Sequence, residues 1–355
     1  MVFERSRDFF GYNMNRGTVE ENVACRPPKV AVLVLNWNGR QVLEDCLRST
    51  FALHYPNLEV IVVDNDSKDD SVKMVRELFP QCLLFQNQAN LGFAAGNNSG
   101  IRLALDRGND YVLILNNDTV IDENSLSALV ERAESDRAIA AVHPKIYFSQ
   151  PEDHIWFGGG RFSYWKGRNA IIGYKHQDCS VCNVPKEMGF LSGCALLVSR
   201  DAWQKVGGFD ESLFFASEDV DWCLRARQAG YKLFYEPRAV IWHRESFTIL
   251  QNNGNAGKMY YYTRNPLVVM WKHGRWWHWL TFLPYHIALS CKRMLLAIRE
   301  RDWTCVRSIV KAFIDFPAAA RRAATQQHSD PLVVDSCSRS QQPDQHKRLT
   351  PRSTQ

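Results

Sequence analysis

The stretch from Tyr111 to Asp118, YVLILNND, is an apolar run of strand length that ends in two asparagines and a carboxylate. About a hundred residues later, Ser217 to Trp222 (SEDVDW) places three acids at the predicted start of a helix. Open α/β sheets bind ligands where their strands end. One acid there can hold a divalent metal on a diphosphate, and a second acid across the cleft can accept a proton from an attacking hydroxyl.

Two apolar runs upstream have the same form. Lys29 to Asn36 (KVAVLVLN) and Leu58 to Asp64 (LEVIVVD) are rich in β-branched residues, which favours buried parallel strands. Such strands, alternating with amphipathic helices, predict an α/β fold with a parallel, doubly wound sheet and right-handed crossovers. The other elements predicted in this half are helices over 39–50, 71–79 and 97–107 and strands over 82–86 and 111–115.

The regular alternation ends after Asp118. Residues 150–187 are rich in glycine, aromatics and histidine, and they predict loops and a hairpin. The remaining patterns predict helices over 122–133, 200–206 and 219–230 and strands over 140–148, 190–199, 231–236 and 239–243.

Charge divides the chain unevenly. The net charge of the 355 residues is +5, but Lys258 to Arg322 holds twelve Lys and Arg against three acids, so that the rest is net acidic. We therefore expect a flexible leader at 1–27, a main domain at 28–257, a basic helical region at 258–323 and a disordered tail at 324–355. The mixed charge of the first eight residues predicts no signal peptide, and the ten cysteines are expected to be reduced thiols. Cys179 and Cys182 are expected to be an incidental loop pair, since no second CxxC accompanies them.

Two polar turns follow predicted strands on the same edge of the sheet. Asp64-Asn65-Asp66-Ser67 suits a strand-to-helix turn capped by its side chains, or a carboxylate that accepts a hydrogen bond from a nucleobase imide. Asn36-Trp37-Asn38 ends the adjacent strand and offers an aromatic face. The small-residue loop Asn90 to Asn98 (NLGFAAGNN) suits either a plain helix start or backbone amides directed at phosphate or sugar hydroxyls.

The acidic cluster at Glu218-Asp219-Val220-Asp221 has two interpretations. Acids at a helix N-terminus are favoured by the helix dipole, and Asp221 with Arg225 forms an i,i+4 pair. Clustered carboxylates beside apolar residues also raise one another's pKa, as a general base requires. His243, which ends another apolar run, is by itself more typical of a structural histidine.

Seven segments, in this order between residues 29 and 265, resemble the family-2 glycosyltransferases of the GT-A fold, most closely their rhamnosyltransferase-like branch. They are VAVLVLNWNG, VVDNDSKDDS, NLGFAAGNNSGI, LILNNDTV, FLSGCALLVSR, GGFDESLFFASEDVDWCLRARQAGY and KMYYYTRNP. The resemblance implies a GT-A nucleotide-diphospho-sugar transferase fold, with a mostly parallel central sheet flanked by helices. It also implies an inverting transfer from a dTDP- or UDP-sugar to a lipid-linked or oligosaccharide acceptor.

The same resemblance implies a set of site residues. Asp219 matches the general base, with Glu218 before it, and Asp118 matches the acid that binds Mg²⁺ or Mn²⁺, with His243 as a further metal ligand. Asp221 and Trp222 match positions near the acceptor. The residues that would bind the nucleotide-sugar are Asn36, Trp37, Asp64, Asn65, Gly92, Asn97, Asn117, Ser192 and Gly193.

The basic C-terminal region is also rich in tryptophan, with five between Trp271 and Trp303. Its apolar run, Trp276 to Leu289, has 14 residues, whereas a membrane-spanning helix needs about 20. An interfacial helix on an anionic membrane fits the pattern, and a helical subdomain packed on the main domain is the alternative. The first option predicts a cytoplasmic enzyme, peripheral on the inner face of a bacterial plasma membrane and without nucleic-acid partners.

Two other functions remain open at this level. One is a non-catalytic nucleotide-sugar-binding scaffold, and the other is a nucleotide-sugar pyrophosphorylase. Retention of Asp64, Asp118, Asp219 and His243 disfavours the scaffold, and a missing glycine-rich N-terminal signature disfavours the pyrophosphorylase. The product released, nucleoside diphosphate or pyrophosphate, would distinguish the transferase from the pyrophosphorylase.

Overall fold

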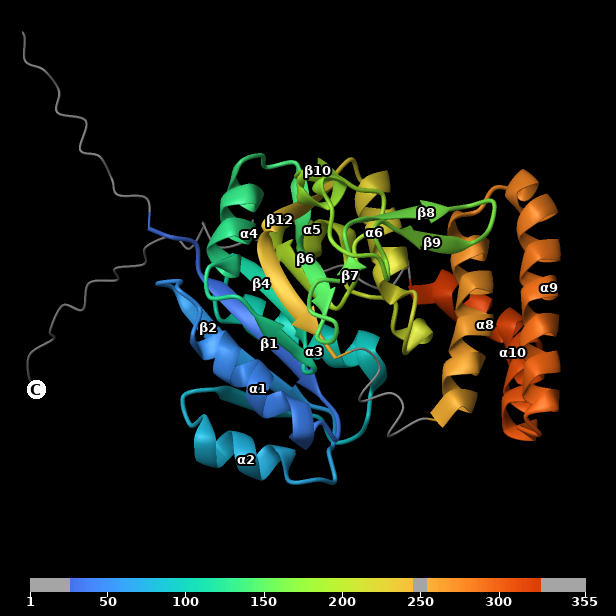
Figure 1. Cartoon of the computed structure of the whole chain (residues 1–355), viewed down its shortest axis with the longest axis horizontal. Helices are drawn as coiled ribbons and strands as arrows, with labels where there is room; N and C mark the ends of the chain where they lie inside the picture. Colours follow the sequence, from blue (N-terminus) through green and yellow to red (C-terminus); the bar gives the residue numbers. More distant parts are fainter. Residues whose placement is uncertain (1–25, 245–253, 327–355) are drawn as a thin grey trace, which may run out of the picture.

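A computed structural model of the chain describes residues 26–244 and 254–326 (Figure 1). The predicted leader at 1–27 lies outside this part except for its last two residues. The predicted tail at 324–355 also lies outside it, except for the first three residues, which end the last helix.

Four parallel strands form the N-terminal half of the sheet, as the sequence predicts. They are β1 (Val30–Asn36), β2 (Leu58–Asp64), β3 (Leu83–Gln86) and β4 (Tyr111–Asn116). The helices between them are α1 (Arg40–Phe51), α2 (Ser71–Leu78) and α3 (Gly92–Asp106). In the β1–β2 register Asn36 pairs with Asp64, so the polar ends of these strands lie side by side.

The complete sheet is mixed rather than uniformly parallel. Strand β11 (Ala195–Ser199) runs antiparallel to both β4 and β6 (Ile139–Phe148), and β12 (Lys232–His243) runs parallel to β6. The strand order is β10-β12-β6-β11-β4-β1-β2-β3. Shorter strands are β5 (Thr119–Ile121), β7 (Ile155–Phe157) and β10 (Lys186–Glu187).

Two details of the predicted elements change in the second half, and one is confirmed. The strand predicted over 190–199 begins only at Ala195. The two strands predicted over 231–236 and 239–243 are one strand, β12, with an irregularity between Glu236 and Val240. The predicted hairpin is present as β8 (Gly160–Ser163) and β9 (Arg168–Ile171). Helices here are α4 (Ser125–Glu134), α5 (Arg200–Val206) and α6 (Glu218–Gln228).

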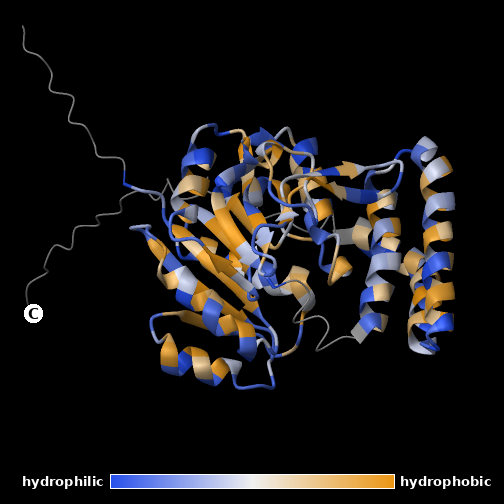
Figure 2. Cartoon of the chain, in the orientation of Figure 1, coloured by the Kyte–Doolittle hydropathy of each residue, from blue (hydrophilic) through white to orange (hydrophobic). Residues whose placement is uncertain are grey.

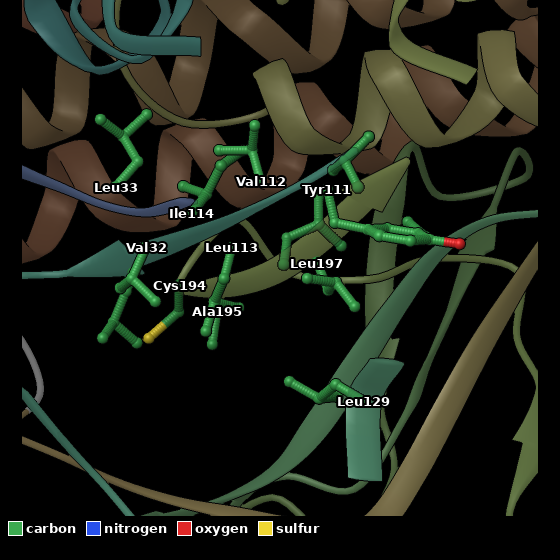
Figure 3. Close-up of a cluster of buried hydrophobic side chains, with 14 of the residues drawn as sticks. Val32, Leu33, Tyr111, Val112, Leu113, Ile114, Leu129, Cys194, Ala195 and Leu197 are labelled. Atoms are coloured by element: carbon green, nitrogen blue, oxygen red, sulfur yellow. The ribbon is translucent and has the colours of Figure 1, made fainter. Parts of the chain in front are cut away.

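The core lies where the central strands are covered by helices. Figure 3 shows side chains of β1, β4 and β11 packed on both faces of the sheet: Leu33 lies beside Ile114 on one face, and Leu113 beside Leu197 on the other, and all four are at most 1% exposed. Figure 2 shows the same strands as the hydrophobic interior of the main domain. This burial holds the strand ends, which carry the polar residues, in fixed positions.

Three helices form a layer at one end of the molecule: α8 (Gly254–His273), α9 (Trp276–Arg299) and α10 (Trp303–Gln326) (Figure 1, right). Val269 of α8 belongs to the main core, so the boundary predicted at 257/258 falls inside a helix that packs on the main domain. Across the described part of the chain, no helix is both long and apolar enough to cross a membrane.

Candidate active site

A cavity of about 670 Å³ lies at the carboxyl ends of β1 and β4. One side is formed by the strand ends, and the other by α6, α8 and the β8–β9 hairpin. Ten of the fifteen predicted site residues line it: Trp37, Asn65, Gly92, Asn117, Asp118, Ser192, Gly193, Glu218, Asp219 and His243. The structure therefore brings together residues from segments up to about 200 positions apart in the sequence.

Asp118 and His243 form a buried pair at one wall. Strand β12 runs antiparallel to β5 with His243 opposite Thr119, which places the imidazole beside the preceding Asp118. His243 Nε2 lies 3.1 Å from Asp118 Oδ1. Burial opposes charge on His243, but the neighbouring Cys194 and Asp118 raise its pKa well above the ordinary value.

This pair offers few ligands for a metal. Among the described residues, no three His, Cys, Asp and Glu side chains are grouped to hold an ion. Within the same residues, His243 Nδ1 has no hydrogen-bond partner, and Asp118 Oδ1 has no partner with hydrogen-bond geometry. A carboxylate oxygen and an imidazole nitrogen fit a divalent ion whose other ligands are substrate phosphates and water.

Glu218 and Asp219 begin α6 at the opposite wall. Asp219 accepts hydrogen bonds from the backbone N–H groups of Gly193 (3.0 Å) and Val220 (2.8 Å). Burial raises the pKa of Asp219, while these two amides lower it. Burial raises the pKa of Glu218 well above its usual range, and the charge of Asp219 raises it further. Two amides therefore favour the ionised form of Asp219, whereas both burial and a neighbouring charge disfavour the ionised form of Glu218.

The loop before α6 is held in an unusual conformation. Phe214, Ala216 and Ser217 all have positive φ, although none is glycine. Asn265 of α8 stabilises the loop, since its Nδ2 donates to the carbonyl oxygens of Phe215 (2.8 Å) and Ala216 (2.6 Å). The α8 helix thus takes part in positioning Asp219.

Gly92 fixes the other end of the same loop. The Phe93 N–H donates to the Phe214 carbonyl at 2.7 Å. A Cβ on Gly92, whose φ is +80°, would lie 2.5 Å from the Phe214 ring. The close approach requires glycine and joins the small-residue loop to the segment that carries Asp219.

Asn36 and Asp64 lie just beneath the cavity surface rather than on it. Asp64 is 1% exposed, and its carboxylate accepts hydrogen bonds from Asn36 Nδ2 (3.1 Å) and the Ser67 N–H (3.0 Å). Asn36 Oδ1 accepts from Asn117 Nδ2 at 2.9 Å. The structure thus shows Asp64 capping the turn, and its contact with a nucleobase stays a prediction.

Asn97 is not placed as predicted. Helix α3 begins at Gly92, five residues before the predicted start, so Asn97 lies one turn inside the helix. It is fully buried and donates to the Phe93 carbonyl at 2.9 Å. Asn97 does not line the cavity, and its contact with a nucleotide-sugar stays a prediction.

Asp221 and Trp222 do not face the cavity either, and both are fully buried. Trp222 Nε1 donates to the Gly207 carbonyl, and its ring stacks on Trp203. Asp221 contacts Arg225 (2.8 Å), Lys272 (2.6 Å) and His273 (2.8 Å). Burial alone would raise the pKa of Asp221, but these cations hold it well below the ordinary value. The structure shows packing and ion-pair contacts for Asp221 and Trp222, and the predicted contacts with an acceptor stay a prediction.

Three basic residues that line the cavity were missed: Arg168 of β9, Lys258 of α8 and Arg293 of α9. The sequence does show their charges, but Arg168 lies in the segment 150–187, which was read only as loops and a hairpin, and Lys258 and Arg293 lie in the basic region, for which a membrane surface was preferred to a packed subdomain. Lys272 and His273 were assigned to that surface too, and the structure instead buries both beside Asp221. Counting charges in the sequence does not show whether a lysine side chain is exposed to solvent or buried in the protein.

Comparison with known proteins is consistent with this geometry. Residues 27–256 match the family described as glycosyltransferase like family 2. The chain is 28% identical over 234 residues to N-acetylglucosaminyl-diphospho-decaprenol L-rhamnosyltransferase of Mycobacterium tuberculosis (strain CDC 1551 / Oshkosh), covering 61% of this chain and 76% of the relative.

A second relative is larger. Poly-beta-1,6-N-acetyl-D-glucosamine synthase of Staphylococcus aureus (strain COL) is 25% identical over 217 residues, or 60% of this chain and 49% of the relative. Among solved structures, that of GalNAc-T7 with UDP, GalNAc and Mn²⁺ superposes with a TM-score of 0.52 at 16% identity, covering 68% of this chain and 51% of that one. This last likeness concerns the GT-A fold alone.

Proposed function

The chain belongs to glycosyltransferase family 2, and from that premise we propose that it moves rhamnose or a similar sugar from a dTDP- or UDP-sugar to a lipid-linked glycan precursor. The observation that carries the proposal is the single cavity, which has Asp118 and His243 on one wall and Asp219 on the other. The name of the mycobacterial relative supports a lipid-diphosphate-linked sugar as the acceptor.

In the proposed mechanism, Asp219 is the general base. Its two backbone hydrogen bonds favour its ionised form and fix its orientation, while burial and the charge of Asp219 raise the pKa of Glu218. Asp219 accepts the proton of an acceptor hydroxyl as the hydroxyl oxygen attacks the anomeric carbon and the nucleoside diphosphate leaves. The family is inverting, and one such displacement inverts the configuration without a covalent enzyme intermediate.

The donor is proposed to bind along the strand ends. Trp37 offers an aromatic face, while Asn65 and Asn117 offer amides to the nucleotide. Ser192 and Gly193 lie between this wall and Asp219, where the transferred sugar would lie. Asn36 and Asp64 support this wall from beneath through their hydrogen bonds.

A divalent ion, Mg²⁺ or Mn²⁺, is proposed to assist the reaction. Asp118 and His243 would hold it, because a buried carboxylate oxygen and the imidazole Nδ1, which has no hydrogen-bond partner among the described residues, fit such an ion. When bound, the ion would neutralise charge on the diphosphate leaving group.

The proposed location is the cytoplasmic side of a bacterial plasma membrane, as a peripheral protein. A lipid-linked acceptor would require contact with a membrane surface. The basic, tryptophan-containing helices α9 and α10 offer one, since large apolar side chains on both are exposed.

The test is the release of nucleoside diphosphate from a panel of dTDP- and UDP-sugars with Mg²⁺ or Mn²⁺. We expect release only when a sugar-diphospho-prenol acceptor is present, and none from the Asp219→Asn variant. Pyrophosphate as the product would support the pyrophosphorylase instead. Tight donor binding without transfer to any acceptor would support the scaffold.

A further inference from the structure

Three cationic side chains converge on the cavity from separate elements. Arg168 comes from the hairpin strand β9, Lys258 from α8 and Arg293 from α9, and all three line the same cavity as Asp219. Arg168 Nη1 donates to the Tyr285 hydroxyl at 3.2 Å, and Arg293 Nη1 donates to the Tyr262 carbonyl at 3.4 Å. Lys258 Nζ lies 5.5 Å from the centroid of the Tyr262 ring.

None of these three cations has an acidic partner within residues 26–244 and 254–326; their contacts are with hydroxyl, carbonyl and ring groups. Burial lowers the pKa of the Arg293 guanidinium, and the charge of Arg168 lowers it further. Burial lowers the pKa of His286 to about 4, and the charges of Arg293 and Arg168 contribute to this shift. Arg168 is exposed, whereas Lys258 and Arg293 are partly buried. Like charges held around one cavity repel each other unless an anion neutralises them.

The cationic cluster lies on the general-base side of the cavity. The ring of Tyr262 stacks on Phe215, with centroids 6.4 Å apart, and Phe215 belongs to the loop that leads into Asp219. The nucleotide-binding strands β1 and β2 lie toward the other end of the molecule (Figure 1). The cluster therefore adjoins the region where an acceptor hydroxyl must lie, rather than the proposed nucleotide wall.

We infer that Arg168, Lys258 and Arg293 form an anion subsite for the diphosphate that joins the acceptor sugar to its lipid, which rests on the proposed function. Arginine forks match phosphate oxygens in pairs, and a lysine adds a third charge. Binding the diphosphate here would hold the acceptor sugar near Asp219. The lipid would then continue along α9, which supplies Arg293 and exposes leucine and isoleucine side chains.

Two matched acceptors test the subsite. They carry the same sugar and the same short alkyl chain, joined through a diphosphate in one and directly through a glycosidic bond in the other. Arg293→Gln should raise the KM for the diphosphate acceptor by about 10- to 100-fold, the loss expected for a charged hydrogen bond. The KM for the plain glycoside and for the donor should stay unchanged. Arg299→Gln, an exposed charge on the same helix outside the cavity, is the matched control.

Several results would overturn the subsite. One such result is an equal rise in the KM for both acceptors. Another is a rise in the KM for the donor, because it would mean that the donor's own diphosphate binds to these cations. Inhibition by phosphatidylglycerol micelles that is lost in Arg293→Gln, without any preference for the diphosphate acceptor, would assign the cations to a lipid headgroup instead.

A binding experiment separates failure of the subsite from failure of the proposed function. Calorimetry with farnesyl diphosphate needs no transfer, and wild type should bind it at least about tenfold more tightly than Arg293→Gln. If wild type transfers sugar but both proteins bind farnesyl diphosphate equally, the subsite is wrong and the transferase stands. If neither acceptor is used but binding depends on Arg293, the subsite stands and the transfer proposal is wrong.

Discussion

Lys272 Nζ lies 2.6 Å from Asp221 Oδ1 and 2.7 Å from Asp210 Oδ2, and all three side chains are at most 4% exposed. Through these contacts α8 is joined to α6, the helix that begins with Glu218 and Asp219. Arg225 and His273 also contact the Asp221 carboxylate, at 2.8 Å each. The C-terminal helices are therefore attached to the active site by buried ion pairs as well as by apolar packing.

Replacing Lys272 with methionine should destabilise the fold strongly. The change leaves Asp210 without its ion-pair partner and Asp221 with one cation fewer, and breaking a buried pair costs about 3–5 kcal/mol. Urea unfolding followed by circular dichroism measures the difference. Lys205→Met, which removes an exposed pair with Asp201, is the control and should cost less than about 1 kcal/mol. Equal effects of the two variants would contradict the buried role of Lys272.

The low pKa of Asp221 also predicts how stability depends on pH. Its pKa is depressed in the folded protein, so its contribution is fully present above the unfolded value of about 3.9 and is lost as pH falls below that value. Acid unfolding of wild type should therefore steepen below about pH 4.

The N-terminal strands could be predicted from sequence. Buried parallel strands have uninterrupted runs of β-branched residues, and here these runs end in polar turns. The start of α3 was predicted five residues too late, and Asn97 was consequently assigned to a ligand-binding loop. Two contacts hold the true start: the Asn90 side chain accepts a hydrogen bond from the Gly92 N–H at 2.9 Å, and the Phe214 carbonyl accepts one from the Phe93 N–H at 2.7 Å. The second contact comes from more than a hundred positions away, so local sequence does not show it.

The site divides in the same way. The family resemblance named Asp118, His243 and Asp219, and the structure brings all three to one cavity. The sequence did not show which way a charged side chain points, because Lys272, Arg293 and Arg299 all lie in similar stretches of mixed aromatic, apolar and basic residues. One is buried against carboxylates, one lines the cavity and one is exposed. Only the packing of α8 and α9 on the main domain distinguishes them.

Asp219 and Glu218 should respond differently to amide substitution. Asp219→Asn removes the base and should lower kcat at least about 100-fold while donor affinity stays unchanged. Glu218→Gln resembles the protonated side chain that burial favours, and it should keep kcat within about tenfold. Steady-state kinetics and donor calorimetry on both variants make the comparison.

The pH profile adds a second readout for the same pair. Because burial raises the pKa of Asp219, the rate should rise with pH through a midpoint above the ordinary value of 3.8. Glu218→Gln should leave that midpoint in place. Near-normal turnover in Asp219→Asn would remove its assignment as the base.

Asp118→Ala should separate metal-dependent from metal-independent donor binding. If Asp118 holds the ion on the diphosphate, the variant should bind donor more weakly with Mn²⁺ present, and EDTA should change what remains very little. Asp122→Ala, whose carboxylate caps a turn before α4, is a matched control. Unchanged affinity and unchanged EDTA sensitivity in Asp118→Ala would show that the metal is held elsewhere or is not used.

The last prediction concerns one face of α9. Trp276, Leu280, Leu283 and Ile287 recur at helical spacing and are between 38% and 72% exposed. Tryptophan and aliphatic side chains on one face, with nearby lysine and arginine, are typical of a helix that lies in an anionic membrane surface. The protein should therefore co-sediment with anionic vesicles, more weakly at high salt because each nearby basic residue contributes about 1 kcal/mol.

Point substitutions are the proper test of that face, because a truncation before Trp271 would also remove Lys272 and leave Asp210 and Asp221 buried without its charge. Serine at the four α9 positions should abolish vesicle binding while the unfolding midpoint stays near that of wild type, since these side chains are already exposed. Val181→Ser with Val184→Ser, two exposed apolar residues in the segment before β10, should change nothing. Equal indifference of wild type to neutral and anionic vesicles would leave α9 as part of a packed helical subdomain with no membrane role.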